Sequence, residues 1–300
     1  MPPRETSQAF GNSNPWTAAM RAGDFGAAFA ISDAVLRARD PATADDARLP
    51  YHLRWVWDGT PVDGRDVLVR CYHGLGDTIQ FSRFLPALGC RARSVHVEVQ
   101  PALLPLITQV PGVDRWIPFR EDRPVPPRTV SLEIMELAHA LRLGPFEVGL
   151  SALTMTPLSL APSPAWGLCW RAGDWIRDRS VPCGALVAAV HRPGRSLISL
   201  QRGSGAEEAG AVFVNPADRS DDVLRTAALL AGLDVVVTVD TMVAHLTGTM
   251  GRPTFLLLKA DADWRWMSER AGSPWYPSLT LLRQNEPGDW SAPLRALGGL

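Results

Sequence analysis

The sequence predicts an α/β fold with two parallel sheets, one in each half of the chain, each covered by helices on both faces. Short apolar runs recur along both halves, and segments with helical apolar spacing separate them. Several runs are almost entirely apolar, as in residues 234–239, which is typical of strands buried on both faces of a parallel sheet. A connection with prolines and serines over residues 144–165 divides the two series. We therefore expect a cleft between the halves, beyond the carboxyl ends of the strands.

Composition is consistent with a globular protein of more than one domain. The chain has 300 residues, of which 46% are hydrophobic, and this content argues against global disorder. Lys and Arg number 30 against 31 Asp and Glu, so the net charge of −1 argues against nucleic acid as a partner. The N-terminus lacks the apolar region of a signal peptide, and no apolar run approaches the roughly 18 residues of a membrane span. A cytoplasmic protein is expected.

The N-terminal part differs from the α/β pattern. We expect residues 1–14 to be disordered and residues 15–60 to form a helical hairpin followed by a linker. Apolar residues follow helical spacing on both sides of a turn at Gly23-Asp24. This segment resembles a single divergent tetratricopeptide-like hairpin, which cannot bury its apolar face alone and must pack on the next domain.

The first α/β domain is expected over residues 61–155. Its expected strands are 67–72, 94–100, 113–119 and the start of 129–143, and its expected helices are 78–89, 101–110 and the end of 129–143. Pro86 is expected to break the first of these helices, because proline removes a backbone donor.

The second α/β domain is expected over residues 156–300. Its expected strands are 165–170, 196–203, 234–239 and 254–259, and its expected helices are 181–192, 221–233 and 240–251. The tryptophans between residues 260 and 277 are expected to pack in the core and not to stack on a sugar or base.

The first candidate site is the turn Gly74-Leu75-Gly76-Asp77, between an apolar strand and a helix. Glycine lets the backbone approach a ligand, and a helix start offers unpaired N–H groups. The turn lacks the third glycine of a dinucleotide-binding fingerprint. From the residues alone, helix capping by Asp77 is the favoured interpretation, and a carboxylate that accepts a proton from a hydroxyl is the alternative.

The second candidate site opens at Asp240-Thr241, where an apolar strand leads into a helix whose backbone amides can bind a diphosphate. Thr241 and His245 are four residues apart, so both side chains can lie on one helix face. A histidine in the core is the alternative for His245. Gly248 and Gly251 allow the helix to pack closely and to end.

The third candidate site is the charged loop 171–180, whose Arg171 and Arg179 can bind a pyrophosphate; a solvated surface loop is equally consistent with the sequence. Lys259 is the only lysine in the chain. The four cysteines and six histidines show no metal-ligand spacing, so we expect reduced thiols and no structural zinc.

Residues 73–88, HGLGDTIQFSRFLPAL, resemble the opening of bacterial glycosyltransferase-family-9-like domains, which are relatives of the lipopolysaccharide heptosyltransferases. Domains of this kind often follow tetratricopeptide repeats. Residues 228–258, with DWRW at 263–266, SPWYP at 273–277 and GDW at 288–290, resemble the C-terminal signature of the same proteins. The resemblance covers most of residues 50–292.

The resemblance implies a GT-B fold with two Rossmann-like domains, and metal-independent, inverting transfer of a sugar from a nucleotide-diphosphate sugar to a glycan, lipid or protein acceptor. It makes Asp77 the candidate catalytic base and implies no cofactor. The candidate donor-binding residues are Gly74, Gly76, Arg171, Arg179, Asp240, Thr241, His245 and Gly248. The alternative is an inactive GT-B-like module that binds sugar nucleotides or proteins. An epimerase of similar fold would need acidic and basic catalytic groups that the sequence does not reveal.

Overall fold

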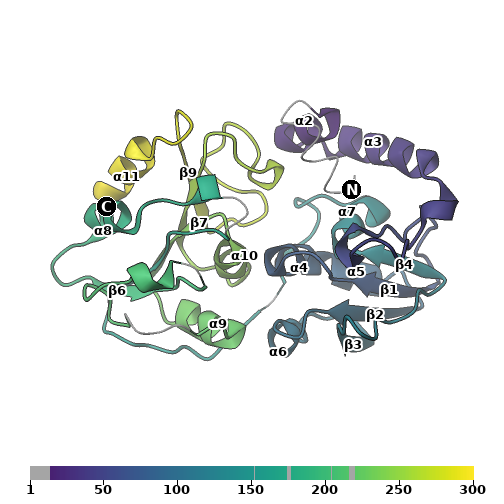
Figure 1. Ribbon diagram of the computed structural model, residues 1–300, viewed down its shortest axis with the longest axis horizontal. Coiled ribbons are helices and arrows are strands. Elements are labelled where there is room, and N and C mark those ends of the chain that lie inside the picture. The colour runs from purple at the N-terminus through teal and green to yellow at the C-terminus, as the bar shows by residue number, and fades with distance from the viewer. Residues whose placement is uncertain (1–13, 152, 174–176, 204, 216–219) are drawn as a thin grey trace. The chain divides into compact units, whose positions relative to one another are not determined.

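The computed structural model describes residues 14–300 except 152, 174–176, 204 and 216–219 (Figure 1). The expected disordered tail therefore lies outside the described residues, apart from Asn14. The chain divides into two compact units, Met1–Ala152 and Leu153–Leu300, each with its own parallel sheet. The division falls within the connection over 144–165, and the two parallel sheets confirm the α/β prediction.

The first unit contains a four-stranded sheet in the order β3-β2-β1-β4, in which all pairs are parallel. Its strands are β1 (Asp66–Arg70), β2 (Ser94–Val99), β3 (Arg115–Pro118) and β4 (Val130–Glu133). Its short helices are α4 (Leu75–Phe81), α5 (Leu85–Gly89), α6 (Leu104–Ile107) and α7 (Leu137–Leu141). The interiors of β1 and β2 are buried, as the apolar runs predict.

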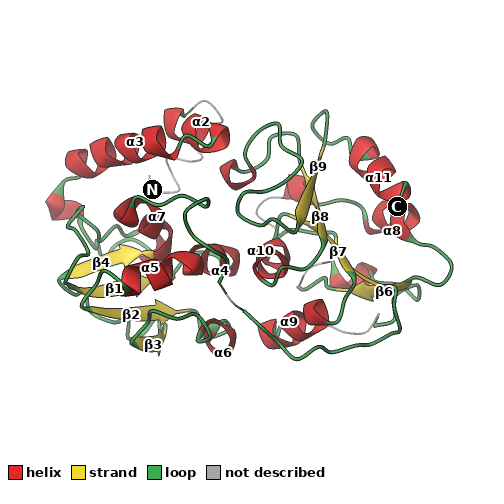
Figure 2. Cartoon of the chain, turned by 180° about the vertical axis from the view of Figure 1, so that it is seen from behind, coloured by secondary structure: helices red, strands yellow, loops and turns green. Residues whose placement is uncertain are grey.

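The predicted hairpin is present as α2 (Pro15–Ala22) and α3 (Phe25–Ala38). Asn14 caps α2, and Gly23 ends it with a left-handed φ of 77°, a conformation that glycine adopts without strain. The hairpin belongs to the first unit, in which α3 lies near α7 (Figure 2). Asp33 of α3 lies 2.8 Å from Nε2 of His139 in α7. As expected, the hairpin packs on the neighbouring α/β domain.

The segment that follows α3, interpreted above as a linker, forms a strap over the carboxyl ends of the first sheet. This strap, residues 39–57, includes two short 3-10 turns, η1 (Pro41–Thr43) and η2 (Tyr51–Leu53). Nη1 of Arg70, at the end of β1, donates to Asp45 at 3.1 Å. The Tyr51 ring packs edge-on against Tyr72 and Phe119, at centroid distances of 5.7 and 5.6 Å. The strap is therefore part of the domain.

The second unit contains a five-stranded parallel sheet in the order β6-β5-β7-β8-β9. Its strands are β5 (Ala165–Cys169), β6 (Ser196–Ser199), β7 (Val235–Val239), β8 (Thr254–Leu258) and β9 (Leu279–Arg283). Its helices are α8 (Cys183–Val190), α9 (Val223–Ala231), α10 (Met242–Thr249) and α11 (Ser291–Gly298). Figures 1 and 2 show α8 and α11 packed together on one face of this sheet, with α9 and α10 on the other.

Successive side chains along a strand point to opposite faces of the sheet, so the core residues divide between the two faces. Leu168 and Val237, which are paired across β5 and β7, point toward α8 and α11. Val236, the neighbour of Val237 in sequence, is paired with Thr254 of β8, and both lie on the opposite face. There the Thr254 hydroxyl lies 3.0 Å from that of Thr247 in α10. Trp264, Trp266 and Trp275 are 8%, 0% and 1% exposed, which confirms their predicted place in the core.

Two predicted helices need correction, and two elements were not predicted. The helix predicted over 78–89 is interrupted just before Pro86, by the 3-10 turn η3 (Ser82–Phe84). It resumes as α5, because Pro86 lies in the first turn, where its missing N–H is not required. The helix predicted over 101–110 is reduced to the single turn of α6. The sequence analysis also missed β9 and α11, since it did not separate them from the tryptophan-rich segment and the C-terminal tail.

Candidate functional site

The turn between β1 and α4 carries the candidate base, Asp77. Gly74 is the N-cap residue of α4, and the Asp77 carboxylate accepts a hydrogen bond from the Gly74 N–H at 3.0 Å. Asp77 therefore caps its own helix, the arrangement that the residues alone favour. The carboxylate is half-buried at the carboxyl edge of the sheet. Its action as a base stays a prediction.

Buried charges that the sequence analysis did not single out lie at the strand ends beside this turn. Arg70, at the end of β1, is 2% exposed. Glu133, at the end of β4, has a carboxylate oxygen 3.7 Å from Nε2 of His73. Burial, together with the charge of Glu136, raises the pKa of Glu133 well above its usual value. The signal was available in the sequence: a charged residue closes each of these two short apolar strands.

In the second unit, α10 begins at the carboxyl end of β7, as predicted. Thr241 is its N-cap, and the Thr241 hydroxyl accepts a hydrogen bond from the Val243 N–H at 3.3 Å. The hydroxyl of Thr238 lies 3.3 Å from that of Thr241. Thr241 is half-buried. The start of this eight-residue helix provides backbone N–H groups and the positive end of a helix dipole, which together favour an anion.

Asp240 lies next to that helix start and is paired with a second predicted residue, Arg179. Oδ2 of Asp240 lies 3.1 Å from Nη1 of Arg179. Burial raises the pKa of Asp240 although the arginine opposes the shift. Burial acts on Asp263 in the same direction, but the Arg265 guanidinium, 2.9 Å away, holds the pKa of that carboxyl below its usual value. The structure thus brings Asp240 and Arg179 together within one buried charge cluster.

His245 and Gly248 face the interior of the second unit. His245 is 5% exposed, its ring stacks on Trp266 at a centroid distance of 5.3 Å, and its Nδ1 lies 3.0 Å from Oη of Tyr276. A methyl group on Gly248 would lie only 2.5 Å from Cγ of Tyr276. These contacts give both residues a packing function, the alternative considered for His245. Their contact with a donor stays a prediction.

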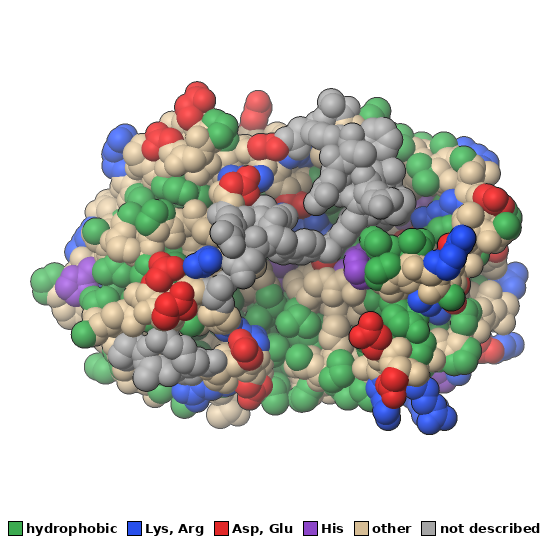
Figure 3. Space-filling model, in the orientation of Figure 1, with side chains coloured by type: hydrophobic (Ala, Val, Ile, Leu, Met, Phe, Trp, Pro, Cys, Tyr) green, Lys and Arg blue, Asp and Glu red, His purple; other side chains and the backbone are tan. Residues whose placement is uncertain are grey.

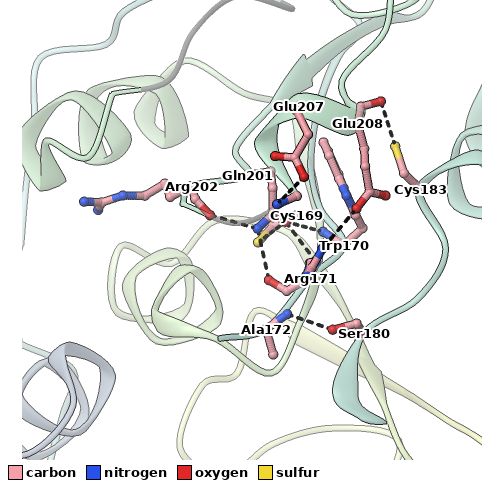
Figure 4. A network of polar contacts seen from close by, with 11 residues as sticks. Cys169, Trp170, Arg171, Ala172, Ser180, Cys183, Gln201, Arg202, Glu207 and Glu208 are labelled. Atoms are coloured by element: carbon pink, nitrogen blue, oxygen red, sulfur yellow. Dashed lines mark hydrogen bonds and ion pairs between the residues drawn. The ribbon is translucent and has the colours of Figure 1, made fainter. Parts of the chain in front are cut away.

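One buried amide holds the start of the charged loop after β5. Oε1 of Gln201 accepts hydrogen bonds from the backbone N–H groups of Trp170 and Arg171, at 3.1 and 2.9 Å (Figure 4). Nε2 of Gln201 donates to the carbonyl oxygens of Arg171 and Arg202, at 3.2 and 3.0 Å. Nη1 of Arg171 lies 3.4 Å from a carboxylate oxygen of Glu208. Gln201, which the sequence analysis missed, therefore fixes the backbone of a predicted donor-binding residue.

Lys259, immediately after β8, is a further cation at this edge that the sequence analysis did not assign to the site. Its Nζ lies 2.6 Å from Oδ2 of Asp178, the residue before Arg179 in the turn η5 (Arg177–Arg179). Arg171, Arg179 and Lys259 thus follow or meet three neighbouring strands, and each is paired with a carboxylate. The edge combines a helix start with cationic side chains, which is the chemistry of an anion site.

Three further observations concern the described parts of the chain. No three His, Cys, Asp or Glu side chains among the described residues are arranged to hold a metal ion. None of the helices that the structure describes is long and apolar enough to cross a membrane. On the face shown in Figure 3, basic side chains are interspersed with acidic ones.

Two parallel-sheet α/β domains are the arrangement of the GT-B-like glycosyltransferases of family 9. The structure of a glycosyltransferase family 9 protein from Veillonella parvula matches with a TM-score of 0.52 and 11% identity over 75% of this chain and 87% of that one. The iron-containing dodecameric glycosyltransferase TibC from enterotoxigenic E. coli matches with a TM-score of 0.52 and 12% identity, over 80% and 74%. These likenesses establish the fold.

One further solved structure and one relative in sequence are also similar to this chain. E. coli heptosyltransferase WaaC, solved with ADP-2-deoxy-2-fluoro heptose, matches with a TM-score of 0.51 and 14% identity over 78% of this chain and 97% of that one. In sequence, Protein FlbA of Caulobacter vibrioides is 25% identical over an alignment of 292 positions, and this alignment covers 83% of this chain and 48% of FlbA. This chain therefore spans about half the length of that relative. No protein-family model matches the sequence.

Proposed function

We propose that this protein transfers a sugar from a nucleotide-diphosphate sugar to a hydroxyl group of a glycan, lipid or protein acceptor. The carboxyl edge of the second sheet carries the proposal. There the Thr241-capped start of α10 lies beside the paired cations Arg179 and Lys259. A departing diphosphate needs hydrogen-bond donors and positive charge, and this edge supplies both. The WaaC structure, which has this fold and holds an ADP-sugar analogue, supports the choice of donor class.

In the proposed reaction, the acceptor oxygen attacks the anomeric carbon as its proton passes to the Asp77 carboxylate. The bond from the anomeric carbon to the diphosphate breaks on the opposite side, so the configuration inverts. The negative charge that develops on the leaving group is stabilised by the α10 N–H groups and by arginine side chains. In this proposal these groups take the place of a divalent metal ion.

A second candidate function is a binding module that holds a nucleotide sugar without transferring it. One observation in the first unit favours this alternative. The strap covers the carboxyl edge where an α/β domain ordinarily binds its ligand, with Asp45 on Arg70 and Tyr51 on Tyr72.

A thermal-shift screen with ADP-, GDP-, UDP- and CMP-sugars, followed by a donor-hydrolysis assay with and without EDTA, tests both functions. A ligand that binds the folded state raises Tm by mass action. CMP-sugars carry one phosphate, so they serve as the control for a diphosphate site. A diphosphate sugar that raises Tm and is hydrolysed supports the transferase. One that raises Tm without turnover supports the binding module, and no shift with any sugar refutes both.

A further inference from the structure

We infer that Lys259 binds a phosphate of the donor diphosphate and that Asp178 holds the place of that phosphate when no donor is bound. The inference rests on the proposed function and assigns a further binding residue to the same edge. Neither residue is among the candidates predicted from the sequence.

Strand register places Lys259 beside the start of α10. Val239 of β7 is paired with Leu257 of β8 in the parallel ladder. Thr241 follows Val239 by two residues, and Lys259 follows Leu257 by two residues. Neighbouring strands lie about 4.8 Å apart, so the lysine leaves the sheet next to the residue that caps the helix. An anion bound at the helix N–H groups is therefore within reach of this flexible side chain.

The turn η5 contacts both strand ends through consecutive residues. Asp178 meets Lys259 at 2.6 Å, and Arg179 meets Asp240 at 3.1 Å. Asp178 therefore presents a carboxylate to Lys259 at the edge where the proposed function requires a phosphate. Since both groups are anionic oxygen acceptors, one can replace the other on the same ammonium.

The exposure of the side chains distinguishes the Lys259–Asp178 pair, which a phosphate can separate, from the Arg179–Asp240 pair. The side chains of Lys259 and Asp178 are 23% and 63% exposed, whereas those of Arg179 and Asp240 are 24% and 10% exposed. An ion pair with one partner open to water contributes little to stability, so a phosphate that carries more charge displaces Asp178 readily. Separating Arg179 from Asp240 would leave a buried carboxylate unpaired, which is costly. We therefore assign the replacement of a carboxylate by the donor phosphate to Lys259 alone.

Isothermal titration of the full chain with ADP tests the inference. Lys259→Met should weaken ADP binding about tenfold to a hundredfold, because a charged hydrogen bond is lost. Asp178→Asn should tighten ADP binding about 1.5- to 5-fold, because the competing pair is removed. Lys259→Arg should bind better than Lys259→Met. The matched control is Asp63→Asn in the first unit, which removes a similarly exposed pair with Arg91 and should leave the affinity unchanged.

The two variants have opposite expected signs, which a merely structural pair would not produce. If Lys259→Met binds ADP as tightly as the wild type, or if Asp178→Asn binds it no more tightly, the inference is wrong although ADP binding by the wild type still supports the proposed function. If the wild type binds no nucleoside diphosphate, the proposed function and the inference are both overturned. Far-UV circular dichroism of each variant verifies that it is folded.

Discussion

Replacing Gly248 by alanine sets helix propensity against packing, and we expect packing to prevail. In a helix interior, alanine is favoured over glycine by about 1 kcal/mol. In α10, however, the added methyl group would lie 2.5, 2.7 and 2.9 Å from Cγ, Cδ1 and Cβ of Tyr276. Tyr276 is fully buried, at 0% exposure, so its ring has little room to move.

The expected loss follows from these contacts. Overpacking of this kind costs about 1–3 kcal/mol. A displaced Tyr276 also loses its 3.0 Å hydrogen bond to His245, which contributes about 0.5–1.5 kcal/mol. After the gain of about 1 kcal/mol in propensity, the net destabilisation is about 2 kcal/mol. For a domain of about 150 residues, this lowers Tm by about 4–8 °C.

Thermal unfolding of Gly248→Ala, followed by circular dichroism, measures this loss, and Gly184→Ala in α8 is the matched control. A methyl group on Gly184 meets no atom within 4 Å. The control should therefore be as stable as the wild type or up to about 1 kcal/mol more stable. A Tm for Gly248→Ala at or above that of the wild type would show that the helix and Tyr276 are not packed as described.

Three further predictions concern the base, a buried histidine and the helix start. Asp77→Asn should reduce donor hydrolysis at least about 100-fold and leave the Kd for ADP unchanged, because an amide is not a base. If the variant and the wild type turn over the donor equally fast, Asp77 is a helix cap only. Burial lowers the pKa of His139, so the unfolded chain binds a proton below about pH 6.5 more readily than the folded chain. Stability should fall as the pH drops from 7 to 5.5, and Tm should drop less in His139→Gln. Thr241→Val should weaken ADP binding by about 1–3 kcal/mol. EDTA should leave the Kd of the wild type for ADP unchanged, and a calorimetric Kd that depends on EDTA would contradict a metal-free site.

The strands of both units could be predicted because a parallel sheet buries both of its faces. The runs that became β1, β7 and β8 are apolar in most positions and are followed by glycine or polar turns, so local pattern and burial agree. Gly23 and Asp24 predicted the hairpin turn, because the conformational preferences of these residues are also a local property of the sequence. By contrast, β9 alternates between buried and exposed residues at the sheet edge, and its pattern is weaker.

The charge pairs of the candidate site could not be predicted, because they join residues far apart in the sequence. Lys259 meets Asp178 across 81 residues. Arg70 meets Asp45, in a strap that composition marks only as rich in turns. Such pairs depend on strand order and loop direction, and neither follows from the periodicity of a single segment.

Asp77 and Thr241 show why a helix start alone does not separate structure from chemistry. Each lies at the carboxyl end of a central strand, and each accepts a hydrogen bond from a backbone N–H of the helix start. Capping fixes the side chain in one orientation, and a fixed orientation is also what a base or a phosphate ligand needs. The two functions are therefore compatible in one residue. What distinguishes them is the surroundings of the strand ends. Thr241 lies at the edge where Arg179 and Lys259 are paired with carboxylates, whereas the strap contacts Arg70 and Tyr72 at the edge that carries Asp77. The second unit consequently carries the stronger physical argument for a ligand, and the Asp77→Asn variant tests whether that ligand is also turned over.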